Sequence, residues 1–475
     1  MKSKAISMLA IVGIMCFSTS CKDTTTSIDT HSHDEVTGHT HTHYNEHNAT
    51  LSHKLIFPSK VPDRIIMNLT QDPASSFAVN WRTNQQIDSG FVEIALATDG
   101  PEFLLKKITI TKAKTEKFEN QHEGEPLVKA NYHAAIVQHL LPNTDYVYRV
   151  GNGEKDTDAK LWSEWFQFTT ASNIKGDAFS FIYFGDAQNQ VKSMWSRVIR
   201  NSYKQFPKVN FMLHAGDLIN SRDSNLEWGE WFYAGSFIHA TIPSIMTPGN
   251  HEYRNEVLTP LWRPQFNLPL NGPSEIEEIY ETSYFVDYQD LKIISVDCIS
   301  FEDNEESRKA QVKWLRAILS KNTKKWIALT MHYPMYTPAK KRDDSEILIE
   351  YLKPIIDQYK IDLVLQGHDH TYARGQVSNK ETGITSISDA GTIYAVSVSG
   401  PKMYESVDKD WIERRGEYTQ LFQIVTIKND TLSYEAYTPI GTLYDAFDLI
   451  KKNGTKKLIN KIPNTPTRLK KDFVE

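Results

Sequence analysis

Five apolar segments of this sequence are each followed directly by a short polar motif. The carboxyl ends of strands in α/β sheets are where ligands bind, so we expect these motifs to converge on one crevice. Carboxylates and imidazoles together suit first-row metal ions such as Fe, Zn or Mn. The candidate metal ligands are Asp186, Gln188, Asp217, Asn250, His332, His368 and His370.

This combination of side chains suits the hydrolysis of a phosphate ester. The reaction needs positive charge near the non-bridging oxygens and a hydroxide near neutral pH, and two metal ions about 3.5 to 4 Å apart supply both. A bridging carboxylate must hold two cations this close, and Asp217 is the best candidate. A single Gly-Asp pair is usually a turn, and a single buried histidine is usually a core residue. The prediction therefore depends on all five motifs occurring, each after an apolar segment.

The segments that must position these motifs have the pattern of an α/β domain. From residue 179 onward, apolar runs alternate with stretches of helical periodicity. The expected strands are residues 179–184, 210–215, 242–247, 291–296, 326–330 and 361–365, with late strands near 391–399 and 421–434. The expected helices are residues 191–206, 307–320 and 345–359.

The preceding segment, residues 61–170, has short alternating strands instead. Turn-forming residues at 141–144 lead into one of these strands. The pattern predicts a β-sandwich of about 100 residues in the immunoglobulin or fibronectin style. No catalytic cluster occurs in this segment.

Composition and charge narrow the choice of partner. The 475 residues are 40% hydrophobic and 24% charged, which is ordinary for a globular protein. A net charge of -6 gives no broad basic face, so nucleic acid is not an expected partner. The expected partner is a small phosphorylated substrate, which the site must grip locally.

The N-terminus has the features of an export signal. Lys2 and Lys4 precede an apolar run over residues 5–17 that is too short to span a bilayer. The small residues before Cys21 resemble a bacterial lipobox, although Ser18 stands where an aliphatic residue is preferred. We expect a lipidated Cys21 and a membrane lipoprotein on the periplasmic or cell-surface side, and a plain secretory signal is the alternative. With Cys16 inside the signal, only Cys298 remains, so no internal disulfide can form.

Seven histidines are scattered between residues 31 and 53 among Thr, Ser, Asp and Glu. This composition predicts a disordered tether. Two interpretations carry equal weight: loose chelation of divalent metal by the clustered imidazoles, or a solvated linker that is rich in histidine.

Several motifs together resemble the calcineurin-like metallophosphoesterases, and specifically the purple acid phosphatases with an N-terminal fibronectin-like domain. The most specific motifs are GNHE at 249–252 and GHDHTYAR at 367–374. Four further segments add to the likeness: SFAVNWRT, LLPNTDYVYRVG, WSEWFQFTT and GTLYDAF. The resemblance implies a four-layer catalytic sandwich of two β-sheets flanked by helices. It also implies that one metal ion is bound by Asp186, Asp217 and His370, and the other by Asp217, Asn250, His332 and His368.

Two positions depart from the purple acid phosphatase pattern. Gln188 stands where that family has glycine and where many other metallophosphoesterases have histidine, and Asn220 stands where the family has tyrosine. We expect Gln188 to contact metal directly or through water. Without a tyrosinate ligand, we expect a nearly divalent metal pair and no purple charge-transfer band.

His251 follows Asn250 directly, so its ring can face the substrate and protonate the leaving oxygen. The alternative is a supporting histidine paired with Glu252. Asp369 is expected to orient a neighbouring histidine or to point away. A further set of side chains could contact phosphate at the rim, although an exposed basic run is more often a solvated loop: Tyr333, Tyr336, Lys340, Lys341, Arg342 and Arg374.

The sequence therefore predicts dinuclear metal-dependent hydrolysis of phosphate monoesters by a metal-bound hydroxide. A phosphodiesterase with the same site is one alternative, and a binding protein with a degenerate phosphatase domain is a less favoured one. The expected organisation is a signal peptide at 1–20, a lipidated His-rich tether at 21–55, a fibronectin-like domain at 56–172, a catalytic domain at 176–450 and a basic C-terminal tail at 451–475.

Overall fold

The computed structural model describes residues 30–32, 40–42, 49–153, 161–377 and 390–473. The expected signal and Cys21 lie outside these residues. The chain divides into two units, residues 1–52 and 53–475. In the first unit β1 (Thr30–Ser32) pairs antiparallel with β2 (Thr40–Thr42), and α1 (Ala49–Ile56) runs across the boundary. Among the helices of the described residues, none is long and apolar enough to cross a membrane.

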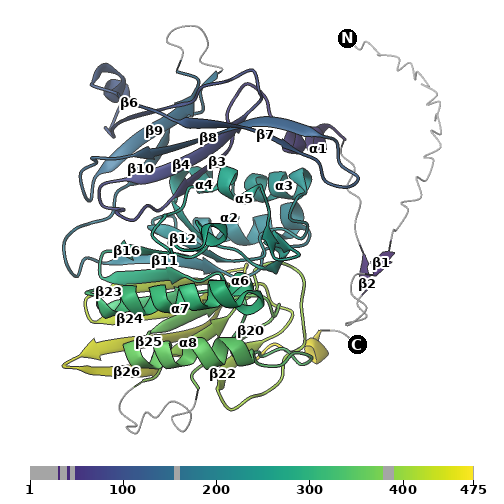
Figure 1. Ribbon diagram of the computed structural model, residues 1–475. Helices are drawn as coiled ribbons and strands as arrows, with labels where there is room; N and C mark the ends of the chain where they lie inside the picture. Colours follow the sequence, from purple (N-terminus) through teal and green to yellow (C-terminus); the bar gives the residue numbers. More distant parts are fainter. Residues whose placement is uncertain (1–29, 33–39, 43–48, 154–160, 378–389, 474–475) are drawn as a thin grey trace, which may run out of the picture. The chain divides into compact units, whose positions relative to one another are not determined.

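The second unit begins with a β-sandwich, drawn at the top of Figure 1. Its alternating strands bury one set of side chains between two sheets, where Val79, Val92, Tyr148 and Phe168 share one core. One sheet contains β3 (Asp63–Asn68), β4 (Phe77–Thr83), β8 (Val128–Val137) and β7 (Lys114–Asn120). The other contains β10 (Phe166–Thr169), β9 (Asp145–Gly151), β5 (Phe91–Leu96) and β6 (Thr109–Lys112), with η1 (Pro101–Leu105) between β5 and β6.

The part that follows the sandwich, from residue 176 onward, is called the catalytic part because a catalytic domain is expected there. It contains two large sheets, as the family resemblance implies. The first has the order β26-β25-β24-β23-β11-β12-β13 and continues into the sandwich. Its strands are β11 (Phe179–Phe184), β12 (Phe211–Ala215), β13 (Ser244–Thr247), β23 (Phe422–Lys428), β24 (Thr431–Tyr437), β25 (Leu443–Lys452) and β26 (Thr455–Asn460). The second contains β16 (Tyr284–Tyr288), β17 (Leu291–Ser295), β18 (Trp326–Thr330), β19 (Leu363–Gln366), β21 (Ile393–Val396), β20 (Tyr372–Gly375) and β22 (Ile412–Gly416).

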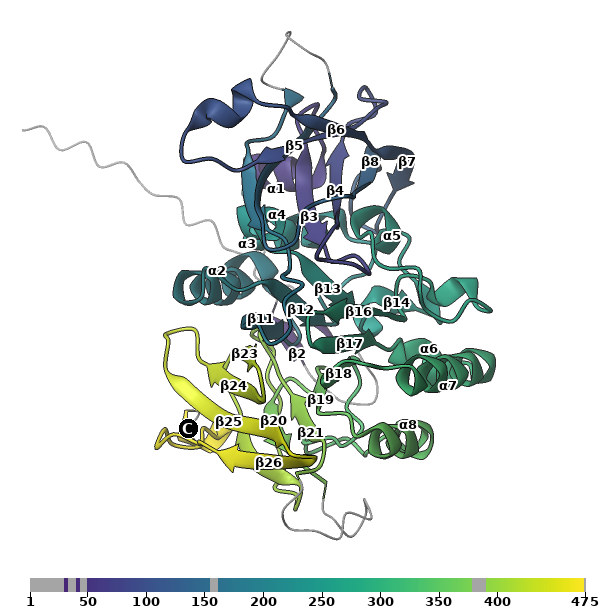
Figure 2. The same ribbon diagram turned by 90° about the vertical axis from the view of Figure 1, so that its left-hand side faces the viewer.

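Helices cover the outer face of each sheet, which gives the four layers seen in Figure 2. Apolar side chains of α2 pack on the first sheet, and those of α7 and α8 pack on the second. On the side of the first sheet lie η3 (Val191–Trp195), α2 (Ser196–Gln205), α3 (Asn225–Gly235), α4 (Phe237–Thr241) and α5 (Trp262–Gln265). On the side of the second lie α6 (Cys298–Asp303), α7 (Glu305–Ser320) and α8 (Glu346–Tyr359). Shorter elements are η4 (Asn250–Glu252), β14 (Tyr253–Arg254), β15 (Val257–Leu258), η5 (Glu277–Ile279) and η6 (Lys470–Asp472).

The predicted fold class is confirmed, and the sequence pattern locates most of the elements. The expected helix at 191–206 begins with a π-helical turn and continues as α2. Residues 451–475, expected as a basic tail, contribute the end of β25 and all of β26, which pairs with β25. Thr455–Asn460 has few apolar residues, as suits an edge strand that pairs only with β25 and leaves its side chains exposed or half-buried.

The first sheet of the sandwich and the first sheet of the catalytic part are one sheet. β3 pairs in parallel with β13 through Asn68 and Ser244, so eleven strands form a continuous ladder. This junction joins the two predicted domains through backbone hydrogen bonds, which the sequence pattern does not indicate.

Candidate metal centre

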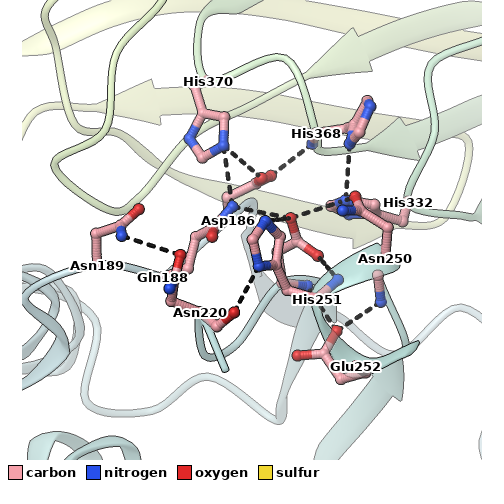
Figure 3. A network of polar contacts seen from close by, with 12 residues as sticks. Asp186, Gln188, Asn189, Asn220, Asn250, His251, Glu252, His332, His368 and His370 are labelled. Carbon is pink, nitrogen blue, oxygen red and sulfur yellow. Dashed lines mark hydrogen bonds and ion pairs between the residues drawn. The ribbon is translucent and has the colours of Figure 1, made fainter. Parts of the chain in front are cut away.

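The structure brings all seven predicted metal-binding side chains to one edge of the two sheets, where Figure 3 shows most of them. Asp186 and Asp217 follow β11 and β12, and Asn250 lies in η4 after β13. His332 follows β18, and the turn between β19 and β20 carries His368 and His370, with Gln188 two residues after Asp186. The strands deliver these residues because their carboxyl ends meet at one edge.

One group of potential ligands consists of Asp217, His332 and His368, whose ligating atoms all lie within 4.8 Å of one another. Nε2 of His332 lies 3.2 Å from each of three atoms: Oδ2 of Asp217, Oδ1 of Asn250 and Nδ1 of His368. Nδ1 of His332 donates to the carbonyl oxygen of Ala215 at 2.8 Å. This bond sets the tautomer, so the lone pair of Nε2 points at the other ligand atoms.

The second group consists of Asp186, Asp217 and His370, and it shares Asp217 with the first. Nε2 of His370 lies 3.5 Å from Oδ2 of Asp186. Gln188 is fully buried, and its Nε2 lies 2.9 Å from Oδ2 of Asp217 and 3.0 Å from Nε2 of His370. Within the described residues, Oδ2 of Asp186 and Oε1 of Gln188 are buried without a hydrogen-bond partner.

The carboxylates and imidazoles perturb one another strongly. Burial raises the pKa of Asp186 to about 7, and the neighbouring charge of Asp217 adds to this effect. Burial also opposes charge on Asp217, but His332 and His251 outweigh it and hold the pKa of Asp217 well below its usual range. Burial lowers the pKa of His332 less than Asp217 and Asp186 raise it, so its pKa reaches about 9. In the metal-free site a protonated His332 therefore balances the charge of Asp217, and a bound cation would take the place of that proton.

The backbone at the site is held in an unfavourable conformation. Asp217, His368 and His370 have φ values of 51, 72 and 46°, in the left-handed region that side chains other than glycine rarely adopt. Such strain costs about 1–3 kcal/mol per residue and tends to occur where function requires it. Gly216, at φ 91°, lets the backbone after β12 lie close to His332, because a Cβ there would lie 2.6 Å from Nδ1 of His332.

The residues present fit a pair of metal ions. Carboxylate, imidazole and amide groups match the ligand preferences of first-row ions. The buried oxygens of Asp186 and Gln188 that lack partners are costly unless a cation or a water satisfies them. Asn220, which stands where the purple acid phosphatases have tyrosine, accepts a hydrogen bond from Asn189 at 3.1 Å, and the absence of a purple band stays a prediction.

His251 lies beside the shared aspartate. Its Nδ1 lies 2.6 Å from the carbonyl oxygen of Asn220, and its Nε2 lies 4.0 Å from Oδ2 of Asp217. The imidazole therefore donates from Nδ1 to the loop and presents Nε2 to the site. Burial lowers the pKa of His251. The pairing of His251 with Glu252, which the sequence left open, does not occur.

Glu252 instead holds the site's backbone, a role that the sequence analysis missed. Its carboxylate accepts hydrogen bonds from the N–H groups of Asp217, Leu218 and Gly249 at 2.9, 2.8 and 2.6 Å. Glu227 acts in the same way on the adjoining loop and accepts from the N–H groups of Asn220 and Ser221. The only signal for Glu252 in the sequence is its place at the end of the GNHE motif.

The basic residues considered for the rim have different roles. Lys340 pairs with Glu405 at the surface, as expected of a solvated loop. Arg342 donates to Oδ1 of Asp369, and Asp369 belongs to neither group of potential metal ligands. Arg374 is fully buried and paired with Asp445, so it cannot contact substrate.

Comparisons with known proteins match both parts of the chain to family models. Residues 62–170 match the family model for the purple acid phosphatase N-terminal domain, and residues 179–372 match that for calcineurin-like phosphoesterases. Acid phosphatase type 7 of Danio rerio is 26% identical over 290 residues, covering 53% of this chain and 59% of that protein. Probable inactive purple acid phosphatase 9 of Arabidopsis thaliana is 25% identical over 293 residues, covering 52% of this chain and 44% of that protein.

A solved structure supports the fold as well. The structure of purple acid phosphatase PPD1 from yellow lupin (Lupinus luteus) has a TM-score of 0.68 at 17% identity, covering 83% of this chain and 75% of that one. The four layers and the paired ligand groups define the class of metal-dependent phosphoesterases. The chain belongs to the calcineurin-like metallophosphoesterases, as a purple acid phosphatase-like member with the N-terminal domain of that group.

Proposed function

We propose that this protein hydrolyses phosphate monoesters with two metal ions. The observation that carries the proposal is the shared position of Asp217 in both groups of metal-binding side chains. A shared carboxylate can hold two cations at the spacing of about 3.5 to 4 Å that phosphate ester hydrolysis uses.

The roles of the chain's own residues follow from their positions. One ion would be held by Asp186, Asp217 and His370, with Gln188. The other would be held by Asp217, Asn250, His332 and His368. Bound in this way, the ions would supply positive charge to the phosphate oxygens and a hydroxide near neutral pH.

His251 is the residue that moves a proton. Its Nδ1–H donates to the carbonyl of Asn220, so Nε2 is the atom that faces the leaving oxygen. The imidazolium form of the ring would deliver its Nε2 proton there and become the neutral ring. The side chain of His251 is 26% exposed, so its ring is accessible to a bound ester.

We also propose where the protein works. The N-terminal signal and the cysteine at position 21 support an exported protein that a lipid tethers to the membrane. A small phosphorylated molecule that reaches His251 and the candidate ligands is then the substrate.

Turnover by protein loaded with single metal ions tests the function. Metal-free protein is reconstituted with Fe, Zn or Mn and assayed with para-nitrophenyl phosphate and with its bis ester. We expect the monoester to be the better substrate. Asp217→Asn should lose both metal ions and lower kcat/KM by more than the about 10- to 100-fold typical of a residue that only supports a ligand.

A matched control separates this loss from a general effect of charge. Asp430 is an exposed carboxylate that pairs with Lys325 and contacts none of the candidate ligands. Asp430→Asn should therefore leave turnover unchanged. Unchanged turnover in Asp217→Asn would contradict the enzymatic role, and preference for the bis ester would assign the protein as a phosphodiesterase instead.

A further inference from the structure

Residues 399–404 form a loop that is anchored on the backbone of two candidate ligands. The N–H groups of Ser399 and Gly400 donate to the carbonyl oxygen of Asp186 at 3.0 and 2.5 Å. The N–H group of Tyr404 donates to the carbonyl oxygen of His370 at 3.0 Å. The loop is therefore fixed at both ends against the site, with Lys402 between the two anchors.

Close packing further limits the movement of this loop. A Cβ on Gly400 would lie 2.6 Å from the carbonyl oxygen of Gln188 and 2.9 Å from that of Ala187. Only glycine permits this approach, so the backbone that carries Lys402 lies directly against the Asp186–Gln188 turn.

Tyr404 connects the side chain of Lys402 with the metal-binding side chains. The Tyr404 ring lies edge-on to His370, with centroids 4.8 Å apart. The ammonium of Lys402 lies 5.7 Å from the centre of the same ring, and the guanidinium of Arg342 lies 5.3 Å from it. One aromatic side chain thus gathers two cations beside His370.

These two cations differ in what they already bind. Arg342 is paired with Asp369. Within the described part of the chain, no carboxylate forms an ion pair with Lys402, and its side chain is only partly buried. The backbone anchor of Tyr404 on His370 and the shared Tyr404 ring therefore place Lys402 near His370, a candidate metal ligand.

We propose that Lys402 binds a non-bridging oxygen of the substrate's phosphoryl group and favours monoesters over diesters. A phosphate monoester carries up to two negative charges on that group, whereas a diester carries one. An ammonium held beside the group therefore stabilises the monoester more. This inference rests on the proposed hydrolysis of phosphate esters and names the residue that sets the substrate class.

Lys402→Met tests the inference, and Lys340→Met is the matched control. Lys340 carries the same charge, but its side chain is 58% exposed and paired with Glu405. We expect Lys402→Met to lower kcat/KM for para-nitrophenyl phosphate by about 10- to 100-fold, as for a lost hydrogen bond to a charged group. The decrease that Lys402→Met causes in kcat/KM for the bis ester should be several-fold smaller. Lys402→Arg should recover most of the activity that Lys402→Met loses.

Binding of inorganic phosphate provides a measurement without turnover. Titration calorimetry on the metal-loaded protein should show weaker phosphate binding in Lys402→Met than in Lys340→Met, with equal metal content in both. Equal phosphate binding, or equal losses with both esters, would overturn the role of Lys402. If wild-type protein loaded with each metal hydrolyses neither ester, the proposed function itself fails, whereas an active wild type with an unaffected Lys402→Met refutes only this inference.

Discussion

At the scale of single residues, Gln188 is the most unusual feature of the site. It occupies a position where the related families have glycine or histidine, yet it is fully buried among metal-binding atoms. Its amide nitrogen faces Asp217 and His370, while its oxygen has no partner among the described residues. Rotation of the amide by half a turn would place the oxygen, a metal ligand, where the nitrogen now lies.

We expect Gln188→Ala to weaken one of the two metal sites selectively. Loss of a ligand or of its water-bridged support should reduce the affinity for one equivalent of metal by about 10- to 100-fold and leave the other unchanged. Competition with a chelating dye measures the two equivalents separately. Gln311→Ala, at a fully buried glutamine that bonds to Ser283, is the control. Equal affinities in Gln188→Ala and wild type would show that Gln188 serves packing only.

At the scale of elements, Glu252 connects the two turns that follow β12 and β13. Its carboxylate binds N–H groups of Asp217 and Leu218 on one turn and of Gly249 on the other. These turns carry the shared aspartate and Asn250, and Asp217 itself is held at φ 51°. Glu252 therefore helps to compensate for the strain that the ligand geometry imposes.

Glu252→Gln should destabilise this arrangement. The amide has one acceptor oxygen instead of two and turns N–H groups toward backbone donors, so at least one buried N–H loses its partner. We expect the free energy of unfolding of the metal-free protein to fall by about 1–3 kcal/mol in urea denaturation. The exposed Glu306→Gln on α7 should change it by less than about 0.5 kcal/mol. A variant as stable as wild type would show that the turns hold their shape without this carboxylate.

At the scale of the whole molecule, the sandwich and the catalytic part behave as one packed body. The β3–β13 junction is reinforced by Arg64, whose guanidinium donates to Gln265 Oε1 at 3.1 Å and to the carbonyl oxygens of Leu55 and Asn225. Burial lowers the pKa of Arg64 to about 10. A buried cation of this kind is stable only while all its acceptors remain in place, which couples the two parts.

The interior of this body also contains neutral histidines away from the metal ligands. His239 is fully buried and stacks on Trp231 at 4.1 Å, with His214 6.3 Å away. Burial lowers the pKa of His239 to about 3 and that of His214 well below its usual value. In the unfolded chain a histidine titrates near pH 6.5, so below that pH the unfolded state binds protons that the folded state does not. Stability should therefore fall as the pH decreases from 6.5 toward 3.

His239→Phe isolates this contribution, because it keeps an aromatic ring at the position. By linkage, the lowered pKa of His239 should reduce the free energy of unfolding by about 2 kcal/mol between pH 6.5 and pH 5. We expect the loss of unfolding free energy from pH 7 to pH 5, measured by urea denaturation of metal-free protein, to be smaller by about that amount in the variant. His139→Asn, at an exposed histidine, serves as the control. Equal losses in His239→Phe and wild type would mean that other groups cause the acid sensitivity.

Local patterns along the chain were enough to predict the fold class and the candidate ligands. Apolar segments of five or six residues mark the buried strands, and the polar motifs follow at their ends. Both signals are local, since strand burial and turn chemistry depend on neighbours in the chain. Asp186, Asp217 and His332 could therefore be assigned to one edge before any distance was known.

The side chains that support and surround these ligands come from contacts between segments far apart in the chain. Glu252 reaches across to the turn after β12, and Lys402 is placed by a loop anchored on residues about 30 and 215 positions earlier in the chain. The join of β3 to β13 rests on one pair of residues, Asn68 and Ser244, far apart in sequence. Contacts of this kind leave no periodic pattern, because they depend on how the sheets stack and on which loops then meet.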